Sequence, residues 1–534
     1  METTPRETEL TVRLEKMEQT VASLTAQLGG ALAENARLAT ENKLLREKID
    51  RLVRRLFGKS SEKLDPAQLE LLLQFPEEDT TLGKSSASPC RGPGADTWEA
   101  PPAQHPRPRP AQPRKPRLPE HLPVEEKVIE PDEVRADPAA WRRIGEEVSE
   151  QLDYEPGRFI RRRTVRPKYV RRGDLEHPPV IAPLPPSLQD ACLAAPGLIA
   201  AIIVFKFCDH LPLYRLEQIF LTRHGVSLPR QTMCRWMALA AFWLRPLYEK
   251  IKTTVLDGHY VQVDETPIEY LSPGHGSTMQ GYLWPVHRPG GDTFFTWHTG
   301  RSAACLDTII PDDWWGVMQC DCYAAYPAFV RKRAARTDAV IILAGCLAHA
   351  RRGFVEALPQ AATACAFILR QMQHLYAIEE RLRQQNAGRT LREVVRHAES
   401  RPIMQRIRRW CTQLSERRIH LPQSGMGKAL SYLLGNWDQL SRFLEDGRIE
   451  IDNNLVENAI RPTAIGKKNW LFVGSDTSGE TSAILYTIIE SARRRGLDPL
   501  EYLRDALSRL PRMTIAQVPE LLPAAWAAAQ EAAA

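Results

Sequence analysis

The longest regular pattern of apolar and polar positions lies at the N-terminus. Residues 1–60 carry nearly seven heptads, with apolar residues at the two seam positions and Asn35 and Asn42 at the first of them. A sustained heptad repeat with buried amides predicts a parallel coiled-coil dimer over residues 1–60. The alternative is a long helix that folds back on its own domain, and Gly29-Gly30 weakens the helix locally.

The composition changes sharply after this helix. Residues 101–120 contain eight prolines and five Lys or Arg, with almost no large apolar side chains. Residues 61–125 are therefore expected to form a disordered Pro/Arg-rich linker. A basic tether of this kind can contact phosphates without reading sequence, although a merely solvated linker has the same composition.

The next segment, residues 126–180, predicts a small basic β-rich module. Arg158–Arg172 holds eight basic residues and no acid, interleaved with apolar residues, which indicates a basic strand or hairpin. Arg162 and Arg166 are candidate DNA phosphate contacts, with a solvated charged face as the alternative. Apolar side chains are expected to form the core of the module: Trp141, Ile144, Val148, Leu152, Tyr154, Phe159, Val165 and Tyr169.

Residues 188–250 predict a helical region with a helix-turn-helix. The first helix is expected over Tyr214–Arg223, the turn over 224–226, and the second helix over Pro229–Met237. Side chains at the start of the second helix would face a major groove, namely Arg230, Gln231, Thr232 and Arg235. Two helices joined by a glycine turn also pack ordinary helical domains, so a packing role is the alternative.

An α/β domain is expected from residue 258 to 475. The predicted elements are, in order, strands at Tyr260–Tyr270, Gly281–His287 and Asp292–His298, a helix at Ala303–Ile309, strands at Gly316–Cys322 and Ala339–Ala344, and a helix from about His349. Three meandering strands followed by a helix, a strand, and another helix and strand are the order of an RNase H-like sheet.

Amphipathic patterns continue to the end of the chain. Long helices at about 355–450, such as Cys365–Arg383 and Lys428–Leu444, predict an inserted all-helical subdomain, and residues 476–534 predict C-terminal helices. The chain is thus expected to be multidomain, with a coiled coil, a small β-rich module, a helix-turn-helix region and an RNase H-like α/β core with a helical insertion.

Three acidic residues stand in contexts that favour a metal site. Asp264 lies within a strand-like run, Asp321 ends another, and Glu457 lies on a later short helix that is expected to stop before Pro462. In the predicted strand order the middle of the first strand lies beside the end of the fourth, which brings together two aspartates that are 57 residues apart. Three carboxylates can hold two Mg²⁺ ions about 3.5–4 Å apart for in-line displacement at a phosphodiester.

Glu457 has a structural alternative. Asn454-x-x-Glu457 is a capping-box pattern, in which the glutamate would only satisfy a backbone N–H. The basic residues Arg461, Lys467 and Lys468 follow on the same segment and favour a site for DNA phosphates instead.

Composition limits the partners. The net charge of +6 and pI near 8.7 are mild for 534 residues, so a nucleic-acid surface must be local. No stretch approaches the ~20 apolar residues of a membrane span, and the start of the chain lacks a signal-peptide pattern, so we expect a cytoplasmic protein without membrane contact. Ten cysteines without a C-x-x-C pair are typical of reduced thiols.

Six motifs, in order over about residues 55–510, resemble the large catalytic subunit of transposases of the insertion-sequence-66 type. They are RLFGKSSEK (55–63), HLPLYR (210–215), DET (264–266), DCYAAY (321–326), CLAHARR (346–352) and IDNNLVE through GKKNWLF (451–472). The resemblance implies a DDE-type transposase with an RNase H-like core, and it maps the catalytic, metal-binding triad onto Asp264, Asp321 and Glu457.

The resemblance also implies cofactors and partners. The cofactor would be Mg²⁺, for which Mn²⁺ can substitute, and the substrates would be the terminal inverted repeats of the element and target DNA. A homo-oligomer through the coiled coil, small accessory proteins of the same element and a place at the bacterial nucleoid are further expectations. A catalytically inactive DNA-binding remnant or accessory repressor is the alternative, and the intact triad favours the active enzyme.

His349 belongs to the motif Cys346-x-x-His349, which the resemblance includes. It would orient a phosphate or a metal-bound water at the active site; a satisfied histidine beside a buried thiol is the alternative, and zinc would need two further ligands. The family usually has a small zinc module before the helix-turn-helix, but the equivalent stretches here, 136–140 and 169–173, contain no cysteine. We therefore expect the module to fold without zinc.

The coiled coil generates a first prediction. A fragment of residues 1–60 should be a helical dimer, because two seam asparagines pair best across a parallel interface. Analytical ultracentrifugation at tens of micromolar, roughly the range in which such a coiled coil persists, measures this directly. A monomer at that concentration would exclude intermolecular pairing.

Overall fold

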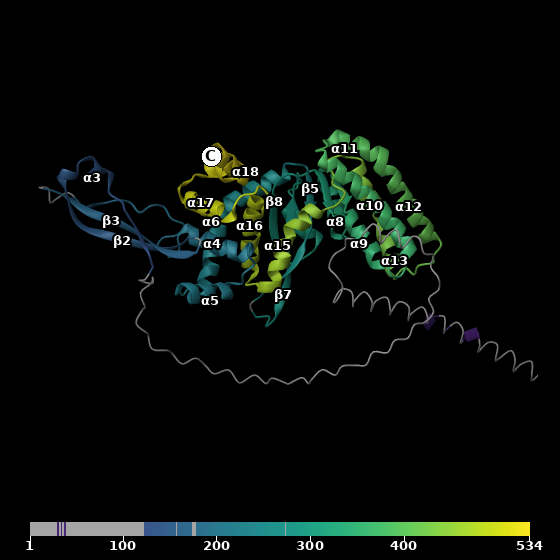
Figure 1. The fold of residues 1–534 in the computed structure, drawn as a ribbon, viewed down its shortest axis with the longest axis horizontal. Coiled ribbons are helices and arrows are strands. Elements are labelled where there is room, and N and C mark those ends of the chain that lie inside the picture. Colours follow the sequence, from purple (N-terminus) through teal and green to yellow (C-terminus); the bar gives the residue numbers. More distant parts are fainter. Residues whose placement is uncertain are drawn as a thin grey trace, which may run out of the picture. The chain divides into compact units, whose positions relative to one another are not determined.

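The computed structural model describes residues 122–533, apart from 156, 173–177 and 273, together with residues 29, 30, 34, 37 and 38 (Figure 1). Apart from those five residues, the predicted coiled coil at 1–60 lies outside the described residues, and so does nearly all of the linker at 61–125. The rest divides into two compact units, a helical unit at Gly345–Ile451 and a larger mixed α/β unit that contains the remaining described residues from 122 onward.

The larger unit begins with a small sheet. Its strands are β1 (Val124–Val128), β2 (Trp141–Glu155), β3 (Arg158–Arg171) and β4 (Val180–Ile181), and a short helix α3 (Asp132–Ala136) follows β1. The β2 and β3 strands form one long antiparallel hairpin, and β1 pairs parallel with the other edge of β3. The predicted basic strand is therefore the central strand of this sheet.

The expected core of the module forms only in part. Leu152, Tyr154 and Phe159, near the hairpin turn, are buried with the helices that follow, but Ile144 and Val148 are 47% and 41% exposed. The prediction that these two residues belong to the core is wrong. They lie on β2, an edge strand of the described sheet, and residues 142–148 of that strand are exposed on both faces.

Three helices follow, α4 (Pro196–Phe207), α5 (Leu213–His224) and α6 (Arg230–Leu256). Gly225 ends α5 in the left-handed conformation (φ 66°), and its N–H donates to carbonyls of the last turn, which is how glycine commonly stops a helix. The second helix of the predicted pair begins as expected but does not end at Met237. It continues to Leu256 because buried apolar residues recur every three or four positions along its whole length.

The main sheet has the strand order β10-β9-β5-β7-β6-β11, with β8 also paired to β7. Its strands are β5 (Tyr260–Val263), β6 (Thr266–Leu271), β7 (Thr278–His287), β8 (Thr293–His298), β9 (Gly316–Cys320), β10 (Ile341–Gly345) and β11 (Phe472–Val473). Helices α7 (Ala303–Ile309) and α8 (Ala325–Ala334) connect β8 to β9 and β9 to β10.

The first predicted strand is divided at Asp264 and Glu265. Its two halves keep one register against the antiparallel strand β7. Val263 pairs with Val286, and Thr266, three residues later, pairs with Leu283, three residues earlier in β7. Asp264 N–H donates to the Pro285 carbonyl at 3.3 Å, but Pro285 has no N–H to return the bond. Asp264 therefore lies at a break in the strand and not within a regular strand as predicted.

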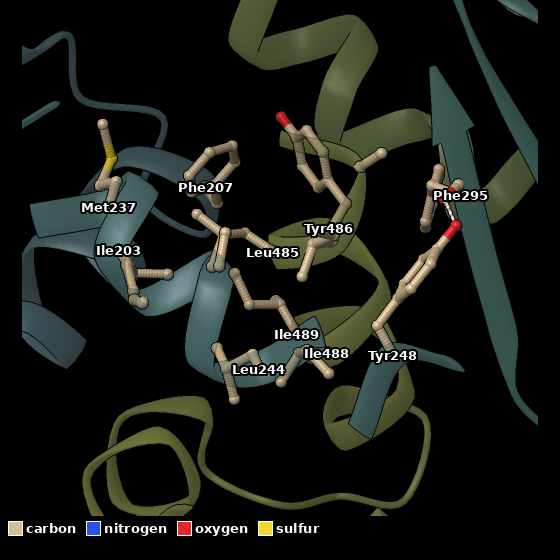
Figure 2. Close-up of a cluster of buried hydrophobic side chains, with 14 of the residues drawn as sticks. Ile203, Phe207, Met237, Leu244, Tyr248, Phe295, Leu485, Tyr486, Ile488 and Ile489 are labelled. Atoms are coloured by element: carbon tan, nitrogen blue, oxygen red, sulfur yellow. Dashed lines mark hydrogen bonds between the residues drawn. The ribbon is translucent and has the colours of Figure 1, made fainter. Parts of the chain in front are cut away.

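Helices from distant parts of the chain build the core. Figure 2 shows side chains of α4, α6 and α16 (Asp476–Arg493) interleaved with β8, including Phe207, Leu244, Ile488 and Phe295. The Tyr248 hydroxyl donates to the Phe295 carbonyl at 3.0 Å, so this buried hydroxyl has a hydrogen-bond partner. Helices α17 (Pro499–Arg509) and α18 (Pro523–Ala533) follow near the C-terminus.

The helical unit contains α9 (Leu347–Ala357), α10 (Ala362–Gln384), α11 (Arg389–Val395), α12 (Arg401–Glu416), α13 (Gly425–Gly435) and α14 (Trp437–Ser441). The predicted helix at Lys428–Leu444 is broken at Asn436, whose backbone leaves the helical conformation and whose side chain donates to the Tyr432 carbonyl. A π-helical segment, Arg396–Ser400, joins α11 to α12.

A buried ion pair anchors this unit. The guanidinium of Arg396 bonds both carboxylate oxygens of Glu379 at 2.7 and 2.8 Å, and both side chains are fully buried. Arg396 also donates to the carbonyls of Phe443 and Asp446, and Arg392 reaches the same glutamate. Each charge is thus compensated, which is the condition for burying a pair of ions.

This pair generates a stability prediction. Glu379→Leu should destabilise the protein by about 3–5 kcal/mol, because Arg396 would remain buried without its partner. Glu379→Leu combined with Arg396→Met should recover much of that loss, as measured by urea denaturation. The exposed pair Arg381–Glu399 supplies the control, since Glu399→Gln should cost less than ~1 kcal/mol. A double variant as unstable as Glu379→Leu would contradict the account.

Candidate functional site: an acidic cluster on the main sheet

Two aspartates come together through parallel strand pairing. Strand β5 pairs with β9 at a constant offset, from Tyr260 opposite Val317 to Gln262 opposite Gln319. Asp264 follows Gln262 by two residues and Asp321 follows Gln319 by two residues, so the aspartates have the same offset of 57 residues. Neighbouring strands lie ~4.8 Å apart, so the two aspartates lie at the same end of the β5–β9 pair, where the charge of Asp321 acts on Asp264.

Backbone geometry fixes both carboxylates locally. The Asp264 Oδ1 atom accepts from the N–H of Glu265 at 2.9 Å, and the Asp321 Oδ1 atom accepts from the N–H of Tyr323 at 2.9 Å. Cys322, directly after Asp321, has a φ of 64°, a left-handed conformation that is rare outside glycine and that turns the chain sharply away from β9. Strained residues of this kind are common at functional sites.

Glu457 lies in the first turns of α15 (Asn454–Trp470), which packs against β5, β6 and β7. The capping-box alternative is wrong, because the N-cap residue is Asn453 and no side-chain cap bond forms from it. The Asn454 side chain instead donates to Asp452 at 2.8 Å. The helix also continues eight residues past Pro462 to Trp470, where a stop before Pro462 was expected.

The three acids share one electrostatic environment. Burial raises the pKa of Asp264 well above its ordinary value, and the neighbouring charges of Glu265, Asp321 and Glu457 raise it further. Carboxylates that interact in this way repel one another when all are ionised. A cation bound among these acids would reduce the repulsion between them.

A fourth acid, Glu265, is buried beside the cluster. Its carboxylate accepts from the Tyr326 hydroxyl at 2.7 Å and forms an ion pair with Arg301, whose guanidinium also lies 3.9 Å from Asp321 and stacks over Tyr323. Burial raises the pKa of Glu265, while the Tyr326 and Arg301 contacts oppose that rise. Arg301 places a fixed positive charge at the edge of the acids.

Sequence reasoning missed Arg301, Tyr326 and the glutamines Gln262 and Gln319. Tyr326 stands in the motif DCYAAY and Gln262 two residues before Asp264, so position relative to the acids could have singled out both. Arg301 had no such signal, because it follows β8 in a loop whose approach to the acids depends on tertiary structure.

The basic residues of α15 have different surroundings. Arg461 and Lys468 are exposed, whereas Lys467 is half-buried and its amine donates to the Pro267 carbonyl at 3.0 Å. Burial and the nearby Lys468 lower the pKa of Lys467. Arg461 and Lys468 are thus available to solvent, and Lys467 is fastened to the start of β6.

The predicted DNA contacts of the hairpin lie in ion pairs. Arg162 pairs with Asp153, and Arg166 pairs with Glu147 and donates to the Ala182 carbonyl at 2.9 Å. The acids lie on β2, which pairs antiparallel with the basic strand β3 along the hairpin. Contact of Arg162 and Arg166 with DNA stays a prediction, and these ion pairs favour a structural role for both.

At the start of α6 the side chains of Arg230, Gln231 and Arg235 are exposed, as predicted, while Thr232 is half-buried. Met233 and Trp236, on the same turns of the helix, are buried and pack against the core. Groove contact by the exposed side chains stays a prediction.

His349 belongs to the helical unit, in the first turn of α9, and the N-cap of this helix is the buried Cys346. Within that unit the histidine lines a cavity of about 260 Å³ together with Arg352, Glu356 and Tyr432. A catalytic role for His349 stays a prediction.

A divalent metal fits the donor set of the acidic cluster. Oxygen ligands from carboxylates are those that Mg²⁺ and Mn²⁺ prefer, and such a cation would relieve the repulsion that raises the pKa of Asp264. Asp264, Asp321 and Glu457 are the residues that would hold it.

Comparison with known proteins identifies the family. The profile described as "Transposase IS66 family" matches residues 191–481, "Transposase C of IS166 homeodomain" matches 44–126, and "IS66 C-terminal element" matches 487–524. The chain belongs to the IS66 transposase family, and membership supports a role as a transposase that binds DNA.

The chain is also similar to two proteins of Sinorhizobium fredii (strain NBRC 101917 / NGR234). The uncharacterized protein y4jD is 36% identical over 426 residues, covering 77% of this chain and 82% of the relative. The uncharacterized protein y4qI is 35% identical over 513 residues, covering 92% and 91% respectively. Among the described residues, no helix is both long and apolar enough to cross a bilayer.

The raised pKa of Asp264 generates a pH-dependent prediction. The folded state holds the Asp264 proton more tightly than the unfolded chain, whose aspartates titrate near pH ~3.9, so stability is lost as pH rises from there through the raised pKa. In a chelating buffer at pH 8, Asp264→Asn should therefore stabilise the protein by about 1 kcal/mol. The gain should shrink at pH 4.5, as urea denaturation at both pH values would show.

Asp307→Asn is the matched control. Burial raises the pKa of Asp307, but hydrogen bonds from Lys332 and Arg336 outweigh it, so this pKa is lowered and the same substitution should destabilise at pH 8. Loss of stability in Asp264→Asn at pH 8 without metal would contradict the account.

Proposed function

We propose that the chain is a DDE-type transposase that cleaves DNA strands at the ends of its element and transfers them to target DNA, with a divalent metal as cofactor. The observation that carries this proposal is the convergence of Asp264 and Asp321, from adjacent parallel strands, with Glu457, from a helix packed on those strands. Family membership supports it independently.

An RNase H-like core is part of the proposal. If β5 and β6 are taken as one strand, the order across the sheet is β8-β7-β5/β6-β9-β10, with β9 parallel to β5 and β7 antiparallel to it. This is the order expected from three meandering strands followed by two helix–strand units. It supports the proposal because it gives Asp264 a place in the middle of the central β5/β6 strand, beside the end of β9, which Asp321 follows.

Each acid would have a distinct task in strand cleavage. Asp264 and Asp321 would hold the metal from the rigid sheet, and Glu457 would complete the ligand set from α15. When bound, a pair of Mg²⁺ ions lowers the pKa of the attacking water and neutralises charge on the attacked phosphate and the leaving 3′ oxygen. In cleavage the water oxygen would bond to phosphorus as the P–O3′ bond breaks, which leaves a 5′-phosphate and, after proton transfer, a 3′-OH on the element. In strand transfer this 3′ oxygen would bond to a target phosphorus, losing its proton, as the target's own P–O3′ bond breaks and releases a target 3′-OH.

Basic and polar groups would place the DNA. Arg461 and Lys468 are exposed on the helix that carries Glu457, so they can neutralise phosphates beside the acids. The exposed Arg230, Gln231 and Arg235 at the start of α6 suit contacts to the terminal repeats. We further propose that the N-terminal coiled coil joins two or more copies at the paired ends.

The proposal predicts separation of binding from cleavage. Asp264→Asn, Asp321→Asn and Glu457→Gln should each lower strand cleavage at the element's ends by at least about 10³-fold, because the metal supplies several kcal/mol of transition-state stabilisation. DNA affinity, measured by fluorescence anisotropy at fixed salt, should fall by less than about threefold, since no phosphate contact is removed.

The matched control is Glu269→Gln, an exposed carboxylate on β6, which should cleave like the wild type. Near-normal cleavage by Glu457→Gln in Mg²⁺ would remove Glu457 from the site. Wild-type protein that binds the ends but never cuts them would establish the inactive remnant instead.

A further inference from the structure

Two buried glutamines lie under the acidic cluster. Gln262 precedes Asp264 by two residues and Gln319 precedes Asp321 by two, so each shares a sheet face with its aspartate. Both glutamine side chains are completely buried. A buried amide without hydrogen bonds is costly, so its partners determine its geometry closely.

The two amides bond across the strand pair. Gln262 Nε2 donates to Gln319 Oε1 at 2.9 Å, and the Tyr260 hydroxyl donates to the same oxygen at 2.7 Å. This bridge joins β5 to β9 through side chains that lie two residues before Asp264 and Asp321 on the two strands. It therefore fixes the orientation of the Gln262 amide relative to the aspartates.

The same amide reaches the helix that carries Glu457. Gln262 Nε2 donates to the Asp452 carbonyl at 2.9 Å, and Gln262 Oε1 accepts from the Val456 N–H at 3.3 Å. The Val456 N–H also donates to the Asn453 carbonyl at 3.1 Å, and the Asp452 side chain accepts from the Asn454 N–H at 3.1 Å, so the first turn of α15 has local partners as well. A strand side chain, about 190 residues away in sequence, thus adds two hydrogen bonds that tie the start of this helix to β5.

We propose that Gln262 is a positioning residue that fastens the first turn of α15 to β5, and so sets the carboxylate of Glu457 against Asp264 and Asp321. The proposal rests on the proposed function, because the three acids must act on one metal site. The sheet supplies two ligands whose spacing is set by the β5–β9 register. The third comes from a helix whose docking depends on this amide.

Gln262→Met tests the proposal in the full-length protein, since it removes both polar atoms at nearly equal volume. Mn²⁺ alone is the probe, with free Mn²⁺ measured by electron paramagnetic resonance. We expect the Mn²⁺ Kd to rise about 10–100-fold, the range for residues that orient metal ligands. The Mg²⁺ concentration for half-maximal strand cleavage should rise with it, while the rate at saturating Mg²⁺ changes far less.

Two further variants keep the test decisive. Gln262→Asn retains the amide but is too short to reach Asp452 and Val456 together, so it should shift the Mn²⁺ Kd in the same direction even if Gln262→Met fails to fold. Gln371→Met, which removes a buried amide from α10 in the helical unit, should leave the Mn²⁺ Kd unchanged. A loss of folding alone would lower the number of binding sites and not their affinity.

A folded Gln262 variant whose Mn²⁺ Kd and Mg²⁺ requirement stay within twofold of the wild type would overturn the proposal. Two outcomes distinguish the positioning role of Gln262 from the proposed transposase activity. If Mn²⁺ binding depends on Gln262 but the wild type never cuts DNA, the positioning role stands and the proposed transposase activity falls. If cleavage occurs and is indifferent to Gln262, the transposase activity stands and the positioning role falls.

Discussion

The parallel pairing of β5 with β9 is the constraint on which the acidic cluster depends. A register offset by one residue would turn one of the two aspartates to the opposite face of the sheet, because side chains alternate along a strand. The observed register places Gln262 opposite Gln319 and, two residues on, Asp264 beside Asp321. The apolar face formed by Val261 and Val263 holds that register, since a slip would move these side chains to the opposite face, where the polar side chains of the two glutamines lie.

Gathering these acids has an energetic cost that the fold offsets locally. Burial and the charges of Glu265, Asp321 and Glu457 disfavour ionised Asp264. The Arg301 guanidinium compensates part of the negative charge through Glu265, and the Tyr326 hydroxyl satisfies the other oxygen of that glutamate. The remaining excess of negative charge is what a divalent cation would neutralise, so the repulsion among the acids and their affinity for a metal would have the same origin.

Local patterns in the sequence were sufficient for most elements of the sheet and for the proximity of two acids. Helix α7 has the predicted ends, and the predicted strand order already brought Asp264 beside Asp321. The errors arose where tertiary packing overrides local signals. Pro462 was expected to end a helix that continues to Trp470, and a capping-box pattern pointed to Asn454 where Asn453 is the cap.

Contacts between distant segments could not be predicted from a single sequence. The bond between Gln262 and Asp452, and the approach of Arg301 to Glu265, depend on how loops and helices return to the sheet. The exposure of Ile144 and Val148 could not be predicted either, because an exposed edge strand has the same apolar pattern as a strand covered by other elements. The acids could be found from motif and strand order, whereas the groups that hold them in place required the structure.

The central claim is that Asp264, Asp321 and Glu457 share one divalent-metal site. Fe²⁺ substituted for Mg²⁺ in the full-length protein, with ascorbate and peroxide, generates radicals that cut the backbone next to the bound metal. The account predicts cuts near all three residues, suppressed together by excess Mg²⁺ and lost together in Asp264→Asn. Cuts near Asp264 and Asp321 without any near Glu457 would contradict it.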